Sequence, residues 1–158
     1  MFLTFPLGAL FEEFLKIMKY KSIFEIIGPV MVGPSSSHTA GALEIALYAR
    51  EKFGRQPKHV EITLYNSFAK TYKGHGTDVA LVGGLLGFAT DDLRIPDALQ
   101  LAVEAEMDVW FVMSDDMADH PNTVKLVLSD ERGQVVVVGE SIGGGSFKIV
   151  PNRGDDDV

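Results

Sequence analysis

The stretch that organises the rest of the chain is residues 28–41, Gly-Pro-Val-Met-Val-Gly-Pro-Ser-Ser-Ser-His-Thr-Ala-Gly. Apolar residues at helical spacing follow it, which predicts a helix over residues 39–53 that ends at Gly54. The helix must begin between Pro34 and Thr39, because Pro suits a first helical turn and Ser or Thr suits the cap. The free N–H groups and the positive dipole end of such a terminus suit a carboxylate or phosphate. Plain helix capping is the alternative, and this stretch alone favours capping.

Composition limits the classes of protein to which the chain can belong. Its 158 residues are 46% hydrophobic and 23% charged, as in one globular domain with a packed core. A formal net charge of -8 without any Lys and Arg cluster argues against a surface for nucleic acid or for an anionic membrane. The chain has no cysteine, which excludes disulfides, zinc-thiolate sites and any iron-sulfur cluster held by its own thiolates. The absence of disulfides is compatible with the cytoplasm, where we expect the protein.

The ends of the chain differ in character from its middle. Residues 1–17 are apolar, but they lack the basic region and the cleavage site of a signal peptide, so we expect an N-terminal extension. The longest apolar runs are shorter than the roughly 20 residues that a membrane-spanning helix needs. Residues 18–150 are expected to form the folded domain, and residues 151–158 a flexible acidic tail.

Two further helices are predicted downstream of the first. A polar loop over residues 67–78 leads into an apolar helix over residues 77–88, with Thr77 as the expected cap. That helix contains three glycines, which we expect to permit close backbone packing: Gly83, Gly84 and Gly87. Pro96 opens the other helix, over residues 96–107.

Strand patterns dominate the second half of the chain. Strands are predicted at residues 60–64, 109–113, 123–129, 134–138 and 146–150, with a turn at 130–133. The order of helices and strands predicts an α+β fold, a mostly antiparallel sheet layered with helices on one face, rather than a doubly wound nucleotide-binding fold.

Several familiar motifs are absent or incomplete. There is no dinucleotide fingerprint, no phosphate-binding loop and no Gly-x-Ser-x-Gly elbow. Adjacency of Ser37 and His38 in sequence does not by itself set one side chain against the other. The histidines lack a metal-ligand spacing, so no metal site is predicted. Residues 67–70, Ser-Phe-Ala-Lys, are similar to the Schiff-base lysine segment of pyridoxal-phosphate dehydratases, but an extra alanine and the short chain argue against that function.

Four polar segments, residues 35–39, 74–78, 120–123 and 141–145, each place a histidine or hydroxyl in a loop flanked by glycine or proline. In this order, and with residues 27–41 as a whole, they resemble the β chain of bacterial iron-sulfur-dependent L-serine dehydratases. The resemblance covers roughly residues 19–150. Residues 1–17 have no counterpart in it, and many β chains continue into a small regulatory ACT domain, so serine feedback through such a domain is not assumed.

The resemblance implies a lyase that converts L-serine to pyruvate and ammonia without pyridoxal phosphate. In that family a 4Fe-4S cluster is bound by cysteines of a partner α chain, and its open iron acts as a Lewis acid on the substrate hydroxyl. It also implies a homo- or hetero-oligomer and a fold similar to the allosteric substrate-binding domain of some phosphoglycerate dehydrogenases. Whether serine is preferred over threonine, and the number of subunits, stay open.

Site residues follow from the same resemblance. The reaction needs a base for the Cα proton and donors for the substrate carboxylate. We expect His75 as the base and His38 as a second catalytic residue. The residues expected to bind substrate are Ser35, Ser36, Ser37, Thr39, His120, Asn122, Ser141, Gly143 and Gly144. A rival hypothesis uses the same helix terminus in a non-catalytic regulatory module that binds a small carboxylate or phosphate effector.

Overall fold

The computed structural model describes residues 30–151. Predictions about residues 1–17 and 152–158 lie outside the described residues, and the domain boundaries stay predictions. Helices and strands follow in the order η1 (Ser36–Ala40), α3 (Gly41–Phe53), β1 (His59–Leu64), α4 (Asn66–Thr71), α5 (Thr77–Leu86), η2 (Ile95–Asp97), α6 (Ala98–Glu104), β2 (Asp108–Met113), β3 (Thr123–Asp130), β4 (Gly133–Gly143) and β5 (Ser146–Val150). Of these, η1 is a π-helix and η2 a 3-10 helix. No helix within residues 30–151 is long and apolar enough to cross a membrane.

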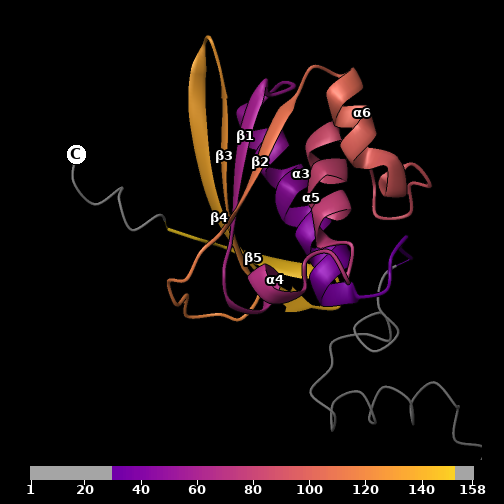
Figure 1. The fold of residues 1–158 in the computed structure, drawn as a ribbon, viewed down its shortest axis with the longest axis vertical. Helices are drawn as coiled ribbons and strands as arrows, with labels where there is room; N and C mark the ends of the chain where they lie inside the picture. Colours follow the sequence, from indigo (N-terminus) through magenta and orange to yellow (C-terminus); the bar gives the residue numbers. More distant parts are fainter. Residues whose placement is uncertain (1–29, 152–158) are drawn as a thin grey trace, which may run out of the picture.

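The five strands form one mixed sheet in the order β2-β1-β3-β4-β5. Strand β1 is parallel to β2, and all other neighbours are antiparallel. The parallel pair arises because α4, α5 and α6 connect β1 to β2 as a crossover. Figure 1 shows α3, α5 and α6 on one side of the sheet. The predicted α+β class is confirmed, whereas the likeness to the phosphoglycerate dehydrogenase domain stays a prediction.

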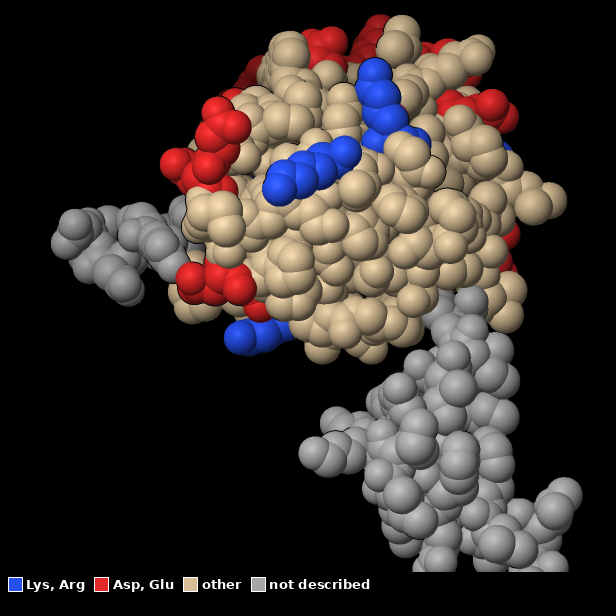
Figure 2. Space-filling model, turned by 60° about the horizontal axis from the view of Figure 1, so that its bottom comes forward, with Lys and Arg blue, Asp and Glu red and all other residues tan. Residues whose placement is uncertain are grey.

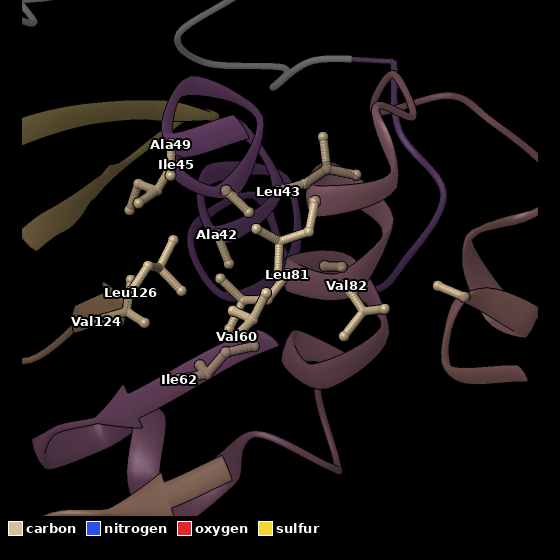
Figure 3. Close-up of a cluster of buried hydrophobic side chains, with 14 of the residues drawn as sticks. Ala42, Leu43, Ile45, Ala49, Val60, Ile62, Leu81, Val82, Val124 and Leu126 are labelled. Carbon is tan, nitrogen blue, oxygen red and sulfur yellow. The ribbon is translucent and has the colours of Figure 1, made fainter. Parts of the chain in front are cut away.

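The core lies between the sheet and the helix pair α3 and α5. Alternate residues of β1 and β3 face the helices, because successive strand side chains point to opposite faces. The fully buried ones are Val60, Ile62, Leu64, Val124, Leu126 and Leu128. Figure 3 shows these strands' side chains meeting those of Ala42, Leu43, Ile45, Leu81 and Val82. This packing holds the ends of β1 and α3, which carry the polar segments, at fixed positions.

Helices α3 and α5 touch through backbone atoms at Gly84. A Cβ added to Gly84 would lie 2.4 Å from the carbonyl oxygen of Leu43 and 2.9 Å from the backbone nitrogen of Leu47. At the neighbouring Gly83 an added Cβ would make only ordinary contacts, the nearest at 3.5 Å. The prediction that glycines of this helix permit close packing is confirmed at Gly84.

The predicted polar loop over residues 67–78 is wrong in its first part, which forms the helix α4. A helix of six residues is too short to be stable alone, and the complete burial of Phe68 in the core stabilises it instead. The prediction that Thr77 caps α5 is also wrong. Gly76 is the N-cap residue, and Thr77 is the first helical residue, fully buried, with its own N–H donating to the carbonyl of Tyr72.

Two element ends differ most from the prediction. Helix α6 ends at Glu104, before the predicted position 107, because Glu106 adopts a left-handed conformation with φ of 54°. A glycine normally signals this kind of helix end, so the sequence contained no stop signal. Strand β4 extends to Gly143 rather than residue 138, because it pairs with β3 and then with β5 along its length. Ser141 and Gly143 therefore belong to a strand rather than a loop.

Candidate functional site

The candidate site lies at one end of the sheet. There the start of α3, the segment after β1, the connection between β2 and β3, and the end of β4 come together. In Figure 1 this is the lower end of the molecule, where α4 lies beside the start of the helix that leads into α3. Polar residues from segments far apart in the sequence meet here because the core fixes each element's terminus.

The helix begins as predicted, between Pro34 and Thr39. Ser35 is the N-cap residue, and its Oγ accepts a hydrogen bond from the backbone N–H of His38 at 3.1 Å. The backbone carbonyl of Ser35 accepts from the N–H groups of Thr39 and Ala40 at 2.9 and 3.2 Å, which gives the wide π-type first turn. Ser35 therefore has at least the capping role. Among described residues, Ser36 Oγ has no hydrogen-bond partner, which leaves that hydroxyl available to a ligand.

His38 lies at the centre of the site, with a hydroxyl at each ring nitrogen. Its Nδ1 is 3.0 Å from Ser37 Oγ, and its Nε2 is 3.0 Å from Ser67 Oγ. The ring also packs edge-on against Phe68. Burial of the ring, and then the proximity of His75, lower the pKa of His38 below the ordinary histidine value. His38 is therefore neutral at pH 7, with one nitrogen donating and the other accepting.

The contact between Ser37 and His38 could not be inferred from the sequence. Adjacency in the chain does not by itself bring two side chains together, and the structure shows that these two share a hydrogen bond. Because Ser67 occupies the other ring nitrogen, the arrangement is a hydroxyl-imidazole-hydroxyl chain.

His75 comes from the loop before α5 and lies against His38, with ring centroids 4.8 Å apart and ring planes tilted by 39°. Its backbone carbonyl accepts from Thr39 Oγ1 at 2.8 Å, and its backbone N–H donates to the carbonyl of Thr71. Within residues 30–151 the His75 ring nitrogens have no hydrogen-bond partner. The structure therefore brings both predicted catalytic histidines together and leaves the nitrogens of one of them available.

The hydroxyls of Ser141 and Thr39 both donate hydrogen bonds to backbone carbonyls of the chain. Ser141 is fully buried and donates from Oγ to the carbonyl of Ser37 at 2.7 Å, which fastens the end of β4 to η1. An added Cβ on Gly41 would lie 2.0 Å from Ser141 Oγ, so this junction requires glycine. Thr39 is likewise buried and bonds to His75. These contacts position the site, and direct substrate binding by either hydroxyl stays a prediction.

The remaining predicted residues lie around this junction. The Ser141 N–H donates to the Asn122 carbonyl at 3.0 Å, Asn122 Nδ2 donates to the Ser141 carbonyl at 3.5 Å, and the Asn122 N–H donates to His120 Nδ1 at 3.1 Å. Gly143, the last residue of β4, and Gly144, in the turn before β5, have positive φ values of 96° and 61°. Among residues 30–151, no hydrogen bond links His120 to His38 or His75, so His120 belongs to the supporting loop.

Ser67 is a site residue that the sequence does not predict, because residues 67–70 match no motif whose function fits this chain. Its N–H donates to the carbonyl of Pro121 at 2.9 Å, which ties α4 to the loop before β3. Asn66, with φ of 46°, donates from Nδ2 to the carbonyls of Ala118 and His120. The available signal was position, because Asn66 and Ser67 directly follow a buried strand, where functional loops begin.

An iron-sulfur cluster does not fit the residues of this chain. The sequence contains no cysteine, and residues 30–151 contain no group of three or more histidine, aspartate or glutamate side chains placed to hold a metal ion. Thiolates from another chain would be needed for such a cluster.

The site lies beside a groove of about 630 Å³ between α4 and the segment after β2, whose lining includes Ser67 and Met113 and the charged residues Lys70, Asp115 and Asp116. Figure 2 brings this lower end of the molecule forward and shows that most of this surface carries no charged side chain. The exposed side chains of Met117 and Ile142 are apolar. A surface with few charges costs little to desolvate when another protein covers it.

The fold and site define an α+β domain with a serine and histidine cluster at one end of its sheet. Residues 22–102 match the protein family described as "Serine dehydratase beta chain". The chain belongs to this family, which confirms the resemblance seen in the sequence. The matched range contains the segments 35–39 and 74–78 but not the two later ones.

Relatives extend the similarity over most of the chain. The chain is 54% identical over 137 residues to "Probable L-serine dehydratase, beta chain" of Bacillus subtilis (strain 168), covering 87% of this chain and 62% of the relative. It is 51% identical over 136 residues to "L-serine dehydratase, beta chain" of Peptoniphilus asaccharolyticus, covering 84% and 61%. It is 30% identical over 161 residues to "L-serine dehydratase 2" of Escherichia coli (strain K12), covering 86% and 35%. The chain thus spans less than two thirds of the length of each of these relatives.

Proposed function

We propose that this chain is the β subunit of an iron-sulfur L-serine ammonia-lyase that converts L-serine to pyruvate and ammonia together with a cysteine-bearing α chain in the cytoplasm. The observation that carries the proposal is the meeting of His38, His75 and the hydroxyls of Ser35 and Ser37 at one end of the sheet. The hydroxyls can donate hydrogen bonds to a carboxylate, and a histidine can accept a proton. These are the two functions that the reaction requires from this chain.

The proposal divides the chemistry between two chains. The 4Fe-4S cluster is assigned to the α chain, since this chain has no cysteine. Ser36 and Ser37, the first two residues of η1, bind the substrate carboxylate. His75 removes the Cα proton, and His38 orients the serine hydroxyls around it. The largely uncharged surface at this end of the molecule is where the α chain would dock.

The proposal is tested by separating and recombining the chains. We expect the purified chain to be colourless and to produce no pyruvate from L-serine under anaerobic conditions. Co-expression with a cysteine-bearing α chain, followed by cluster reconstitution, should restore pyruvate formation. Turnover of L-serine by the isolated chain would refute the assignment. If the α chain forms pyruvate without this chain, and this chain only changes the rate, the result would instead support the hypothesis of a regulatory module.

Replacing Ser36 and Ser37 together by alanine should raise the KM of the assembled enzyme for L-serine by about tenfold or more, as expected when hydrogen bonds to a carboxylate are lost. The domain should stay folded, because the cap residue Ser35 is retained. Steady-state kinetics and thermal unfolding of the same preparation measure the two effects.

The matched control is Ser35→Ala, which removes the cap and should reduce the free energy of unfolding by about 1 kcal/mol. If the double variant has an unchanged KM, Ser36 and Ser37 do not bind the substrate carboxylate, and the carboxylate site lies elsewhere.

A further inference from the structure

The hydrogen bonds around His38 form a chain whose direction depends on one proton. Ser37 Oγ lies 3.0 Å from Nδ1 and Ser67 Oγ lies 3.0 Å from Nε2. Burial and the neighbouring His75 lower the pKa of His38, so the ring carries a single proton at pH 7. A neutral imidazole has one donor nitrogen and one acceptor nitrogen. The two serine hydroxyls therefore cannot both donate to the ring, and the tautomer decides which of them does.

Each tautomer has a different consequence for Ser37. With the proton on Nδ1, the ring donates to Ser37 Oγ, Ser67 donates to Nε2, and the hydrogen of Ser37 is free to bind another acceptor. With the proton on Nε2, Ser37 must use its hydrogen on Nδ1. A carboxylate is only an acceptor, so it can be bound by Ser37 in the first state and not in the second.

Ser67 is held in a position that serves this contact. Its backbone N–H donates to the carbonyl of Pro121 at 2.9 Å, and its carbonyl accepts from Thr71 Oγ1 at 2.8 Å. Neither bond uses the Ser67 hydroxyl, and within residues 30–151 that hydroxyl bonds only to His38. On the other side, Ser35 Oγ lies 3.4 Å from Ser37 Oγ and adds a second hydroxyl that can donate to it.

We propose that Ser67 is a positioning residue for substrate binding: by donating to His38 Nε2 it keeps the proton on Nδ1, which leaves the Ser37 hydroxyl free to donate to the substrate carboxylate. This inference rests on the proposed function for the identity of the ligand. The control of His38 by Ser67 is a property of the chain itself, and it can be measured without a partner or substrate.

The first test is the tautomer of His38 in the full-length chain with ¹⁵N-labelled histidine, measured by long-range ¹H–¹⁵N correlation NMR at pH 7. The wild-type chain should show a protonated Nδ1 and an unprotonated Nε2. In Ser67→Ala the proton should move toward Nε2, because Ser37 is then the remaining donor, and Ser67→Thr should restore the wild-type pattern. A wild-type ring protonated mainly on Nε2 would overturn the proposal.

The second test uses the assembled enzyme. Ser67→Ala should raise the KM for L-serine by about tenfold while kcat changes less than about twofold, and Ser67→Thr should return KM toward the wild-type value. Ser129→Ala, a serine at the opposite end of β3, is the control and should leave both parameters unchanged. A KM unaffected by Ser67→Ala would contradict a role in carboxylate binding.

The two tests fail in different ways. If the wild-type tautomer is as expected but the assembled chains form no pyruvate, the proposed function is wrong and the control of His38 by Ser67 stands. If pyruvate forms but the tautomer or the KM does not respond to Ser67, this inference alone is wrong.

Discussion

His75→Asn should lower the kcat of the assembled enzyme by at least about 10²-fold, the usual loss when a positioned base is removed. Asparagine keeps a polar side chain of similar size but cannot take a proton at neutral pH. The KM for L-serine should change much less, because the proposed carboxylate donors are Ser36 and Ser37. Anaerobic steady-state kinetics, with the cluster spectrum as a check of assembly, measure the effect.

The structure favours His75 over His38 as the base. Both ring nitrogens of His38 are engaged by Ser37 and Ser67, whereas those of His75 have no partner among the described residues. The His75 backbone is held by Thr39 and Thr71, so replacing the ring leaves these contacts in place. The loss of activity should therefore come without a loss of folding.

His59→Asn is the matched control. His59 lies on the surface at the start of β1, with its side chain 52% exposed and its Nδ1 3.2 Å from Asp108. Its replacement should leave kcat unchanged. A His75→Asn enzyme with near wild-type kcat would remove His75 from the mechanism, and His38 or a group of the α chain would be the next candidate.

Gly84→Ala should reduce the free energy of unfolding by about 3 kcal/mol, at the upper end of the cost of overpacking a core. The added Cβ would lie 2.4 Å from the Leu43 carbonyl oxygen and 2.8 Å from the Ala46 Cβ, atoms that cannot rotate away. Helices α3 and α5 must then separate, and the start of α3 carries the serine and histidine cluster. Urea unfolding of the isolated chain measures the loss.

The control for this variant is the adjacent Gly83→Ala. Its Cβ would meet Ile95 and Phe88 at 3.5 Å, an ordinary contact distance. Alanine is also favoured over glycine inside a helix by up to about 1 kcal/mol. Gly83→Ala should therefore be neutral or slightly stabilising. Equal effects of the two substitutions would mean that helix propensity, and not the close contact, governs this crossing.

Local patterns were sufficient to predict most elements. The alternation at residues 60–64 and the helical spacing before Gly54 correspond to β1 and α3. Side-chain periodicity and cap residues are local features, and β1 and α3 depend mainly on such local features. Predictions failed where contacts between residues far apart in the sequence determine whether an element forms or where it ends. Helix α4 depends on the burial of Phe68, and the end of α6 depends on a left-handed Glu106.

The candidate site shows the same division. The sequence by itself determined the residue types, the helix start at residues 35–39, the absence of cysteine ligands and the family resemblance. Only the tertiary structure decided which of these residues meet. His38 and Ser67 are 29 positions apart, and they touch because the core fixes the end of β1 next to the start of α3. Side-chain contacts across such separations depend on how whole elements pack, and no local pattern in the sequence encodes that packing.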